Sequence, residues 1–127
     1  MLTFSSGKVF YTVIIRENGG RGVSKRDGAY TEQFVAQQLT GAGVSLYYFS
    51  SADAKTELDF LSEIDGRAIP IEVKAGTNLQ SKSLTHFVNK HHIERAVKFS
   101  QAPQRRNEII FNEPLYLAEY LTRLVSD

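Results

Sequence analysis

Asp59, Glu72 and Lys74 are the side chains whose types and spacing best suit chemistry. They lie in two runs of alternating apolar and polar residues, and an Asp-Gly pair at 65–66 separates the runs, which is a strong signature of a β-hairpin. If this pair forms a two-residue loop, positions whose numbers sum to 131 face each other, so Asp59 is expected opposite Glu72. Lys74 follows Glu72 by two residues and is expected on the same face.

Two carboxylates held together in this way have a chemical use. At a separation of roughly 5 Å they repel each other unless a divalent cation or a proton lies between them. Hard oxygen ligands of this kind suit Mg²⁺ or Mn²⁺, and either ion can activate a bound water for attack on a phosphodiester. A neighbouring ammonium can orient the water or stabilise developing negative charge, and Glu32, from an upstream helix, is a candidate third carboxylate.

The same residues also admit a plainer interpretation. Glu72-Val73-Lys74 is an alternation that many half-solvated strands carry without any catalytic role. Pro70 cannot donate a hydrogen bond to a ladder and could force a bulge that shifts the register by one residue. In the expected register the apolar residues of the hairpin face the core on the side away from the acids, namely Leu58, Phe60, Ile71 and Val73.

The elements that must position these residues suggest a mixed α/β (α+β) sheet with helices packed on both faces. Residues 29–39 have helical spacing, with Glu32 beside an apolar stripe and Thr31 as a candidate cap. A second helix is expected over 81–89, with Ser83 as a candidate cap, and a third over 115–125. Besides the hairpin, strands are expected at 8–16, 44–50, 95–100 and 108–111, and a polar loop at 17–28.

Composition and length narrow the class of protein. A chain of 127 residues with 42% hydrophobic residues fits one globular domain. No apolar run approaches the roughly 20 residues of a membrane span, and no secretory signal pattern is present, so no membrane association is expected. The absence of Cys excludes disulfides and thiolate sites and is compatible with a cytoplasmic location.

Charge is segregated along the chain. Residues 29–73 contain two Lys or Arg against seven Asp or Glu, whereas residues 74–106 contain seven against one. The basic residues that we expect to contact nucleic-acid phosphates are Lys82, Lys90, Arg95, Arg105 and Arg106. No base-reading motif accompanies them, which favours sequence-nonspecific or structure-directed DNA binding, although separate solvated faces would give the same charge pattern.

Several blocks of the chain resemble a known family. Glu57-Leu58-Asp59, a hairpin spacer and Glu72-Val73-Lys74 resemble the PD-(D/E)XK nuclease superfamily. More narrowly, the chain is similar to the C-terminal domain of unknown function that follows prokaryotic AAA-type ATPase domains. That likeness runs over residues 29 to about 120, in blocks at 32–39, 46–49, 57–61, 69–76, 81–84 and 114–118. Residues 1–28 depart from it as an atypical N-terminal strand and loop.

The resemblance implies a restriction-endonuclease-like core, a central mixed sheet flanked by helices. It implies Asp59 and Glu72 as Mg²⁺ (or Mn²⁺) ligands, Lys74 as the catalytic lysine and Glu32 as an accessory acid. The expected function is metal-dependent hydrolysis of DNA phosphodiester bonds, and the alternative is an inactive nuclease-fold module that binds DNA or an AAA-type ATPase. Gly7-Lys8 lacks the remaining residues of a phosphate loop, so an ATPase is expected as a partner or as a missing domain.

Overall fold

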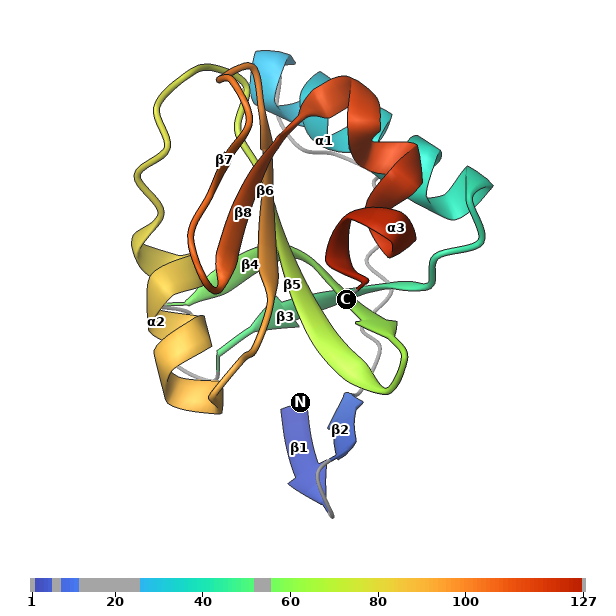
Figure 1. Cartoon of the computed structure of the whole chain (residues 1–127), viewed down its shortest axis with the longest axis vertical. Helices are drawn as coiled ribbons and strands as arrows, with labels where there is room; N and C mark the ends of the chain where they lie inside the picture. The colour runs from blue at the N-terminus through green and yellow to red at the C-terminus, as the bar shows by residue number, and fades with distance from the viewer. Residues whose placement is uncertain (1, 6–7, 12–25, 52–55, 127) are drawn as a thin grey trace.

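The structure is a computed structural model that describes residues 2–5, 8–11, 26–51 and 56–126 (Figure 1). Its strands are β1 (Leu2–Ser5), β2 (Lys8–Tyr11), β3 (Leu46–Ser50), β4 (Glu57–Ile64), β5 (Arg67–Val73), β6 (Ala96–Ser100), β7 (Arg105–Arg106) and β8 (Ile110–Pro114). Its helices are α1 (Arg26–Gly41), α2 (Lys82–His91), the 3₁₀ helix η2 (Leu115–Tyr120) and α3 (Leu121–Val125).

A mixed sheet forms the centre of the molecule, with strand order β3-β4-β5-β6-β8-β7. β5, β6 and β8 are parallel, whereas β3, β4 and β7 run antiparallel to their neighbours. Helix α2 covers one face, and α1, η2 and α3 cover the other (Figure 1). β1 and β2 pair separately as a hairpin. The α/β class, with a mixed sheet flanked by helices, is therefore confirmed.

The central hairpin has the register that the sequence predicts. Asp65 and Gly66 form its turn with φ values of 54° and 76°, which is the left-handed backbone that a two-residue hairpin loop requires. Residues pair from Ile64 with Arg67 to Phe60 with Ile71, always with numbers that sum to 131. The pairing passes through Pro70 without a shift, so this proline does not disturb the register.

Both faces of the hairpin are buried, which corrects the expectation of one apolar and one polar face. Phe60, Ile71 and Val73 lie in the core under α1, as expected. On the other face Leu61 and Ala68 pack against α2, because a sheet covered by helices on both sides must be apolar on both sides. Asp59 and Glu72 therefore lie at one end of a strand pair whose middle is buried on both faces.

A β-bulge in β4 explains why Leu58 lies in the core under α2 rather than with Phe60. Between β3 and β4 the pairs are Tyr47 with Leu61 and Phe49 with Leu58. Two β4 residues, Asp59 and Phe60, therefore oppose a single residue of β3. The extra residue reverses the alternation of side chains, so Leu58 and Leu61 share a face.

Element ends differ from the sequence expectations in several places. Helix α1 begins at Arg26, so Thr31 lies inside it and is not a cap. Gly28 also lies inside this helix, where a glycine costs about 1 kcal/mol of stability that packing of the helix on the sheet offsets. Helix α2 has Ser81 rather than Ser83 as its N-cap. The expected closing helix is divided into η2 and α3, and the short strand β7 was not expected.

The N-terminal expectations are tested only in part. The strand expected at 8–16 is described as β2 over 8–11, and residues 12–16 lie outside the described residues. Of the loop expected at 17–28, residues 17–25 also lie outside them, whereas residues 26–28 belong to α1 and are helical. Across the described ranges, the helices are too short or too polar for any of them to traverse a bilayer.

The turn glycine provides the first testable prediction. Gly66→Ala should lower the free energy of unfolding by about 1–2 kcal/mol, because an L-residue at φ 76° is strained even though the added Cβ would meet no atom within 4 Å. Gly41→Ala is the matched control: its Cβ also meets nothing, but its backbone is helical, so Ala should be neutral or stabilising. Urea denaturation measures both, and equal effects would contradict the backbone argument.

Candidate active site

Asp59 lies where strands β4 and β5 separate. The β4–β5 ladder ends at the pair Phe60–Ile71, so Asp59 and Glu72 are not the ladder pair that the sequence register predicts. Instead, the carboxylate of Asp59 takes the place of a strand partner: its Oδ2 accepts the backbone N–H of Val73 at 2.7 Å. The bulge thus places this carboxylate at the end of β5, where it interacts electrostatically with Glu72.

Three carboxyl groups interact at this position. Burial raises the pKa of the Asp59 carboxyl to about 7; the hydrogen bond from Val73 opposes the rise, and the nearby Glu32 and Glu72 add to it. Glu32, from α1, also forms a side-chain hydrogen bond with Asp59. A hydrogen bond between two carboxyl groups requires a proton, and no cationic side chain is among the described groups that act on the Asp59 pKa.

Glu72 lies on the positively charged side of the site. Its Oε1 forms an ion pair with Lys74 Nζ at 3.3 Å. The other oxygen, Oε2, is buried and has no hydrogen-bond partner among the residues that the structure describes. A buried carboxylate oxygen without a partner carries a desolvation cost, which a cation or a proton donor would remove.

Lys98 is a member of the site that the sequence reasoning missed. The parallel register of β5 and β6 pairs it with Glu72, and its Nζ donates to the backbone carbonyl of Leu79. Burial lowers the pKa of Lys98 and Lys74 adds to that effect, whereas Glu72 opposes it. In the sequence, only the position of Lys98 between the apolar residues Val97 and Phe99 pointed to it. The strand pairing that aligns Lys98 with Glu72 is a tertiary feature.

The residues fit a divalent cation to a limited extent. Asp59 and Glu72 supply the hard oxygen donors that Mg²⁺ and Mn²⁺ prefer, and Glu72 Oε2 is available for coordination. However, in the part of the chain that the structure describes, no three His, Asp or Glu side chains are grouped closely enough to form a metal cluster. The fit is therefore that of a two-carboxylate site, with Glu32 acting through its contact with Asp59.

The five expected phosphate-binding residues do not all converge. Lys82 and Lys90 are exposed near opposite ends of α2. Arg105 and Arg106 line a cavity of about 250 Å³ together with Lys98, so this pair lies on the side of the sheet where Glu72 has its lysine partners. Arg95 does not line that cavity.

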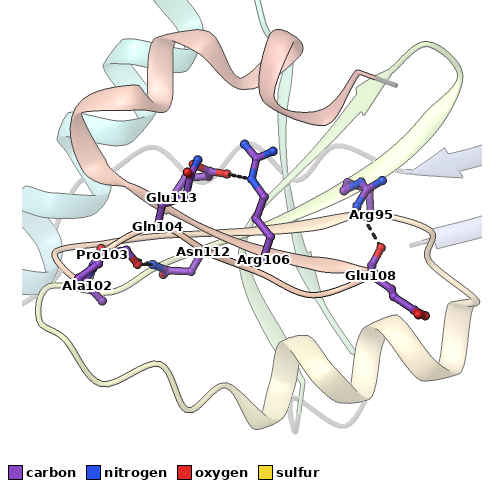
Figure 2. A network of polar contacts seen from close by, with 8 residues as sticks. All are labelled: Arg95, Ala102, Pro103, Gln104, Arg106, Glu108, Asn112 and Glu113. Atoms are coloured by element: carbon purple, nitrogen blue, oxygen red, sulfur yellow. Dashed lines mark hydrogen bonds and ion pairs between the residues drawn. The ribbon is translucent and has the colours of Figure 1, made fainter.

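Arg95 and Arg106 have structural contacts at the β6–β8–β7 edge (Figure 2). Arg106 Nε binds Oε1 of the fully buried Glu113 at 2.6 Å, and Gln104 donates to the other oxygen of Glu113 at 2.7 Å. Arg95 Nη1 donates to the carbonyl of Glu108 at 3.0 Å. The two guanidinium groups also lie over the ring of Phe111, at 4.0 and 4.5 Å from its centroid.

Comparison with known proteins identifies one family. A model described as "Domain of unknown function (DUF4143)" matches residues 27–117. The comparison with curated proteins and the comparison with solved structures gave no match.

The raised pKa of Asp59 predicts a pH dependence of stability. Its pKa of about 7, against the usual 3.8, means that the folded protein binds this proton more tightly than the unfolded chain. The free energy of unfolding should therefore fall as the pH rises from about 4 to about 7, and this part of the fall should be absent in Asp59→Asn. At pH values above 7 the variant should be more stable than the wild type by up to about 4 kcal/mol, since each pKa unit corresponds to about 1.4 kcal/mol.

Glu57→Gln is the control for this measurement, because it removes an exposed carboxylate from the same strand. Urea denaturation at several pH values should give the wild-type profile for Glu57→Gln and a flatter profile for Asp59→Asn. A wild-type profile for both variants would show that the Asp59 carboxyl is ionised in the folded protein throughout this range.

The buried Glu113 makes Arg106 structurally important. Arg106→Ala should reduce the free energy of unfolding by about 3 kcal/mol, because it leaves a fully buried carboxylate without its cation. Arg105→Ala, at the exposed neighbouring position, should change it by less than about 0.5 kcal/mol. Chemical denaturation of the two variants measures the difference, and equal stability would refute the structural role of the ion pair.

Proposed function

The chain belongs to the DUF4143 family, a domain family of unknown function, and we propose from its site that it is a metal-dependent nuclease-like domain that hydrolyses DNA phosphodiester bonds. The observation that carries this proposal is the buried Oε2 of Glu72, which has no hydrogen-bond partner within the described chain, in a residue near enough to interact electrostatically with the Asp59 carboxyl. Two carboxylates in this position, with one oxygen available, suit a hard divalent cation.

Each residue of the site has a distinct role in the proposed reaction. Asp59 and Glu72 would hold Mg²⁺ or Mn²⁺, and the bound ion would lower the pKa of a coordinated water and neutralise charge on the phosphodiester. The Val73 N–H donates a hydrogen bond to Oδ2 of Asp59 and so fixes the orientation of this carboxylate. Glu32, an accessory acid on α1, acts on the site through its hydrogen bond with the Asp59 carboxyl.

Lys74 is the proposed catalytic lysine. Its Nζ lies 3.3 Å from Glu72 Oε1, so the ammonium group is held at the edge of the carboxylate pair. From there it would orient the attacking water and stabilise negative charge that develops on the phosphate. Lys98, on the adjacent strand, adds a second positive charge beside Glu72.

Membership of the PD-(D/E)XK nuclease superfamily is part of this proposal. Its support is the arrangement of the motif: an Asp on one strand of a hairpin, Glu-Val-Lys at the end of the next, and a helical Glu, all on a mixed sheet flanked by helices. DNA is the proposed substrate, because Lys98, Arg105 and Arg106 line one cavity and no base-reading motif accompanies them.

A second function is favoured by a specific observation. The pKa of Asp59 is raised to about 7 and its carboxyl is hydrogen-bonded to Glu32, so a proton by itself can relieve the repulsion in this site. In that case the domain would be an inactive module that binds DNA or an AAA-type ATPase. The two functions differ in one measurable property, the binding of a divalent cation.

Calorimetric titration with Mn²⁺ tests the metal site. The wild type should bind Mn²⁺, and Asp59→Asn and Glu72→Gln should each weaken that binding by at least tenfold, since each removes one of two charged ligands. Glu57→Gln, an exposed carboxylate on the same strand as Asp59, should bind as the wild type does. Negligible heats for all four proteins would remove the metal centre and favour the inactive module.

A plasmid-nicking assay with the same proteins then tests the chemistry. We expect nicking by the wild type in Mg²⁺ or Mn²⁺ and loss of nicking in Lys74→Ala with Mn²⁺ binding retained. Nicking that persists undiminished in Asp59→Asn would point to a contaminating enzyme and overturn the assignment.

A further inference from the structure

An aromatic cavity lies beside the carboxylate site and has no part in the chemistry described above. Its volume is about 500 Å³, within the range of small-molecule sites. Its walls include three aromatic side chains, Tyr30, Phe34 and Tyr116, and three polar residues, Thr31, Ser100 and Gln101. No Lys, Arg, Asp or Glu is among the described residues that line it.

The aromatic residues of this cavity are exposed to solvent, the two tyrosines most of all. Tyr30, Phe34 and Tyr116 have exposed fractions of 67%, 42% and 71%. Tyr30 and Phe34 are four residues apart on α1 and therefore lie on the same side of the helix, and Tyr116 belongs to η2, which contacts α1. Large aromatic rings gathered around one exposed cavity are typical of a binding surface rather than of a core.

The cavity lies at the same end of the sheet as the carboxylate site. Thr31 directly precedes Glu32 on α1. Backbone hydrogen bonds from Lys74 N to Phe99 O, at 2.8 Å, and from Gln101 N to Gly76 O, at 3.3 Å, join the segment that follows β5 to the end of β6 and the residue after it. Both sites therefore lie at the carboxyl ends of parallel strands, which is where α/β sheets usually bind ligands.

The lining also limits the kind of ligand. Aromatic faces bind other aromatic faces by stacking, and the exposed amide of Gln101 offers both a donor and an acceptor at the rim. A nucleobase presents this combination, a flat aromatic face with donors and acceptors on its edge. A charged small molecule would find no counter-ion in the lining, whereas the phosphates on either side of a bound base would lie toward the partly exposed Lys74.

We propose that this cavity is a stacking subsite for one unpaired nucleobase of the strand whose phosphate lies at Asp59, Glu72 and Lys74. This inference rests on the proposed function and adds a substrate class to it. The domain would act on single-stranded or frayed nucleic acid, since a base within a duplex is already stacked and its face is covered.

Fluorescence anisotropy with a labelled single-stranded DNA oligonucleotide, in EDTA to prevent cleavage, tests this subsite. Tyr30→Ala and Tyr116→Ala should each raise the Kd by about tenfold, which is the usual effect of removing one stacking partner. Tyr120→Ala, a similarly exposed tyrosine on η2 that does not line the cavity, should leave the Kd unchanged. Circular dichroism shows whether each variant retains the wild-type fold.

The nucleic acid provides the second control. An oligonucleotide of the same length with abasic residues should bind the wild type as weakly as the unmodified strand binds Tyr116→Ala, and a duplex should be insensitive to both substitutions. Equal Kd values for wild type, Tyr30→Ala and Tyr116→Ala, or no binding of the single strand, would overturn the subsite. Failure of Mn²⁺ binding or nicking with stacking-dependent binding intact would instead overturn only the catalytic function.

Discussion

The hydrogen bond from Val73 N–H to Asp59 Oδ2 is the interaction on which the site depends. At 2.7 Å it replaces the next rung of a ladder that ends at Phe60–Ile71. A buried backbone N–H at the end of a strand needs an acceptor, and the bulge in β4 supplies one in the form of a carboxylate. The end of the hairpin and the position of the acid are therefore set by the same bond.

An uneven distribution of charge follows from this arrangement. Glu72 has Lys74 in an ion pair and Lys98 as its neighbour on β6, whereas the groups that act on the Asp59 carboxyl, besides a backbone N–H, are two more carboxyls. In a partly buried position such like charges cannot all remain ionised without a cation. Lysine side chains of the fold therefore balance the charge beside Glu72, whereas the carboxyl groups around Asp59 require a proton or a metal ion.

Polar contacts within the β7–β8 edge of the sheet support β6, the strand that carries Lys98. Buried Glu113 on β8 binds Arg106 of β7 (Figure 2). The Arg95 and Arg106 guanidinium groups each lie over the ring of Phe111. These contacts hold β7 and β8 beside β6, whose register aligns Lys98 with Glu72. Arg106 thus stabilises the edge strands that border the cavity shared with Lys98, and its contribution to nucleic-acid binding must be separated from that role.

The sequence by itself determined the hairpin, because Asp65-Gly66 permits a positive φ at both turn positions and the alternation around it allows one register. It also determined that Asp59, Glu72 and Lys74 would lie near one another, and that helices would flank a mixed sheet. Only the tertiary structure decided the bulge at Asp59, the contact with Glu32 and the alignment of Lys98, because each depends on how distant segments pair and pack. Local patterns specify a turn and its strands, whereas the contacts between strands and helices far apart in the chain depend on burial of both sheet faces, which no single segment encodes.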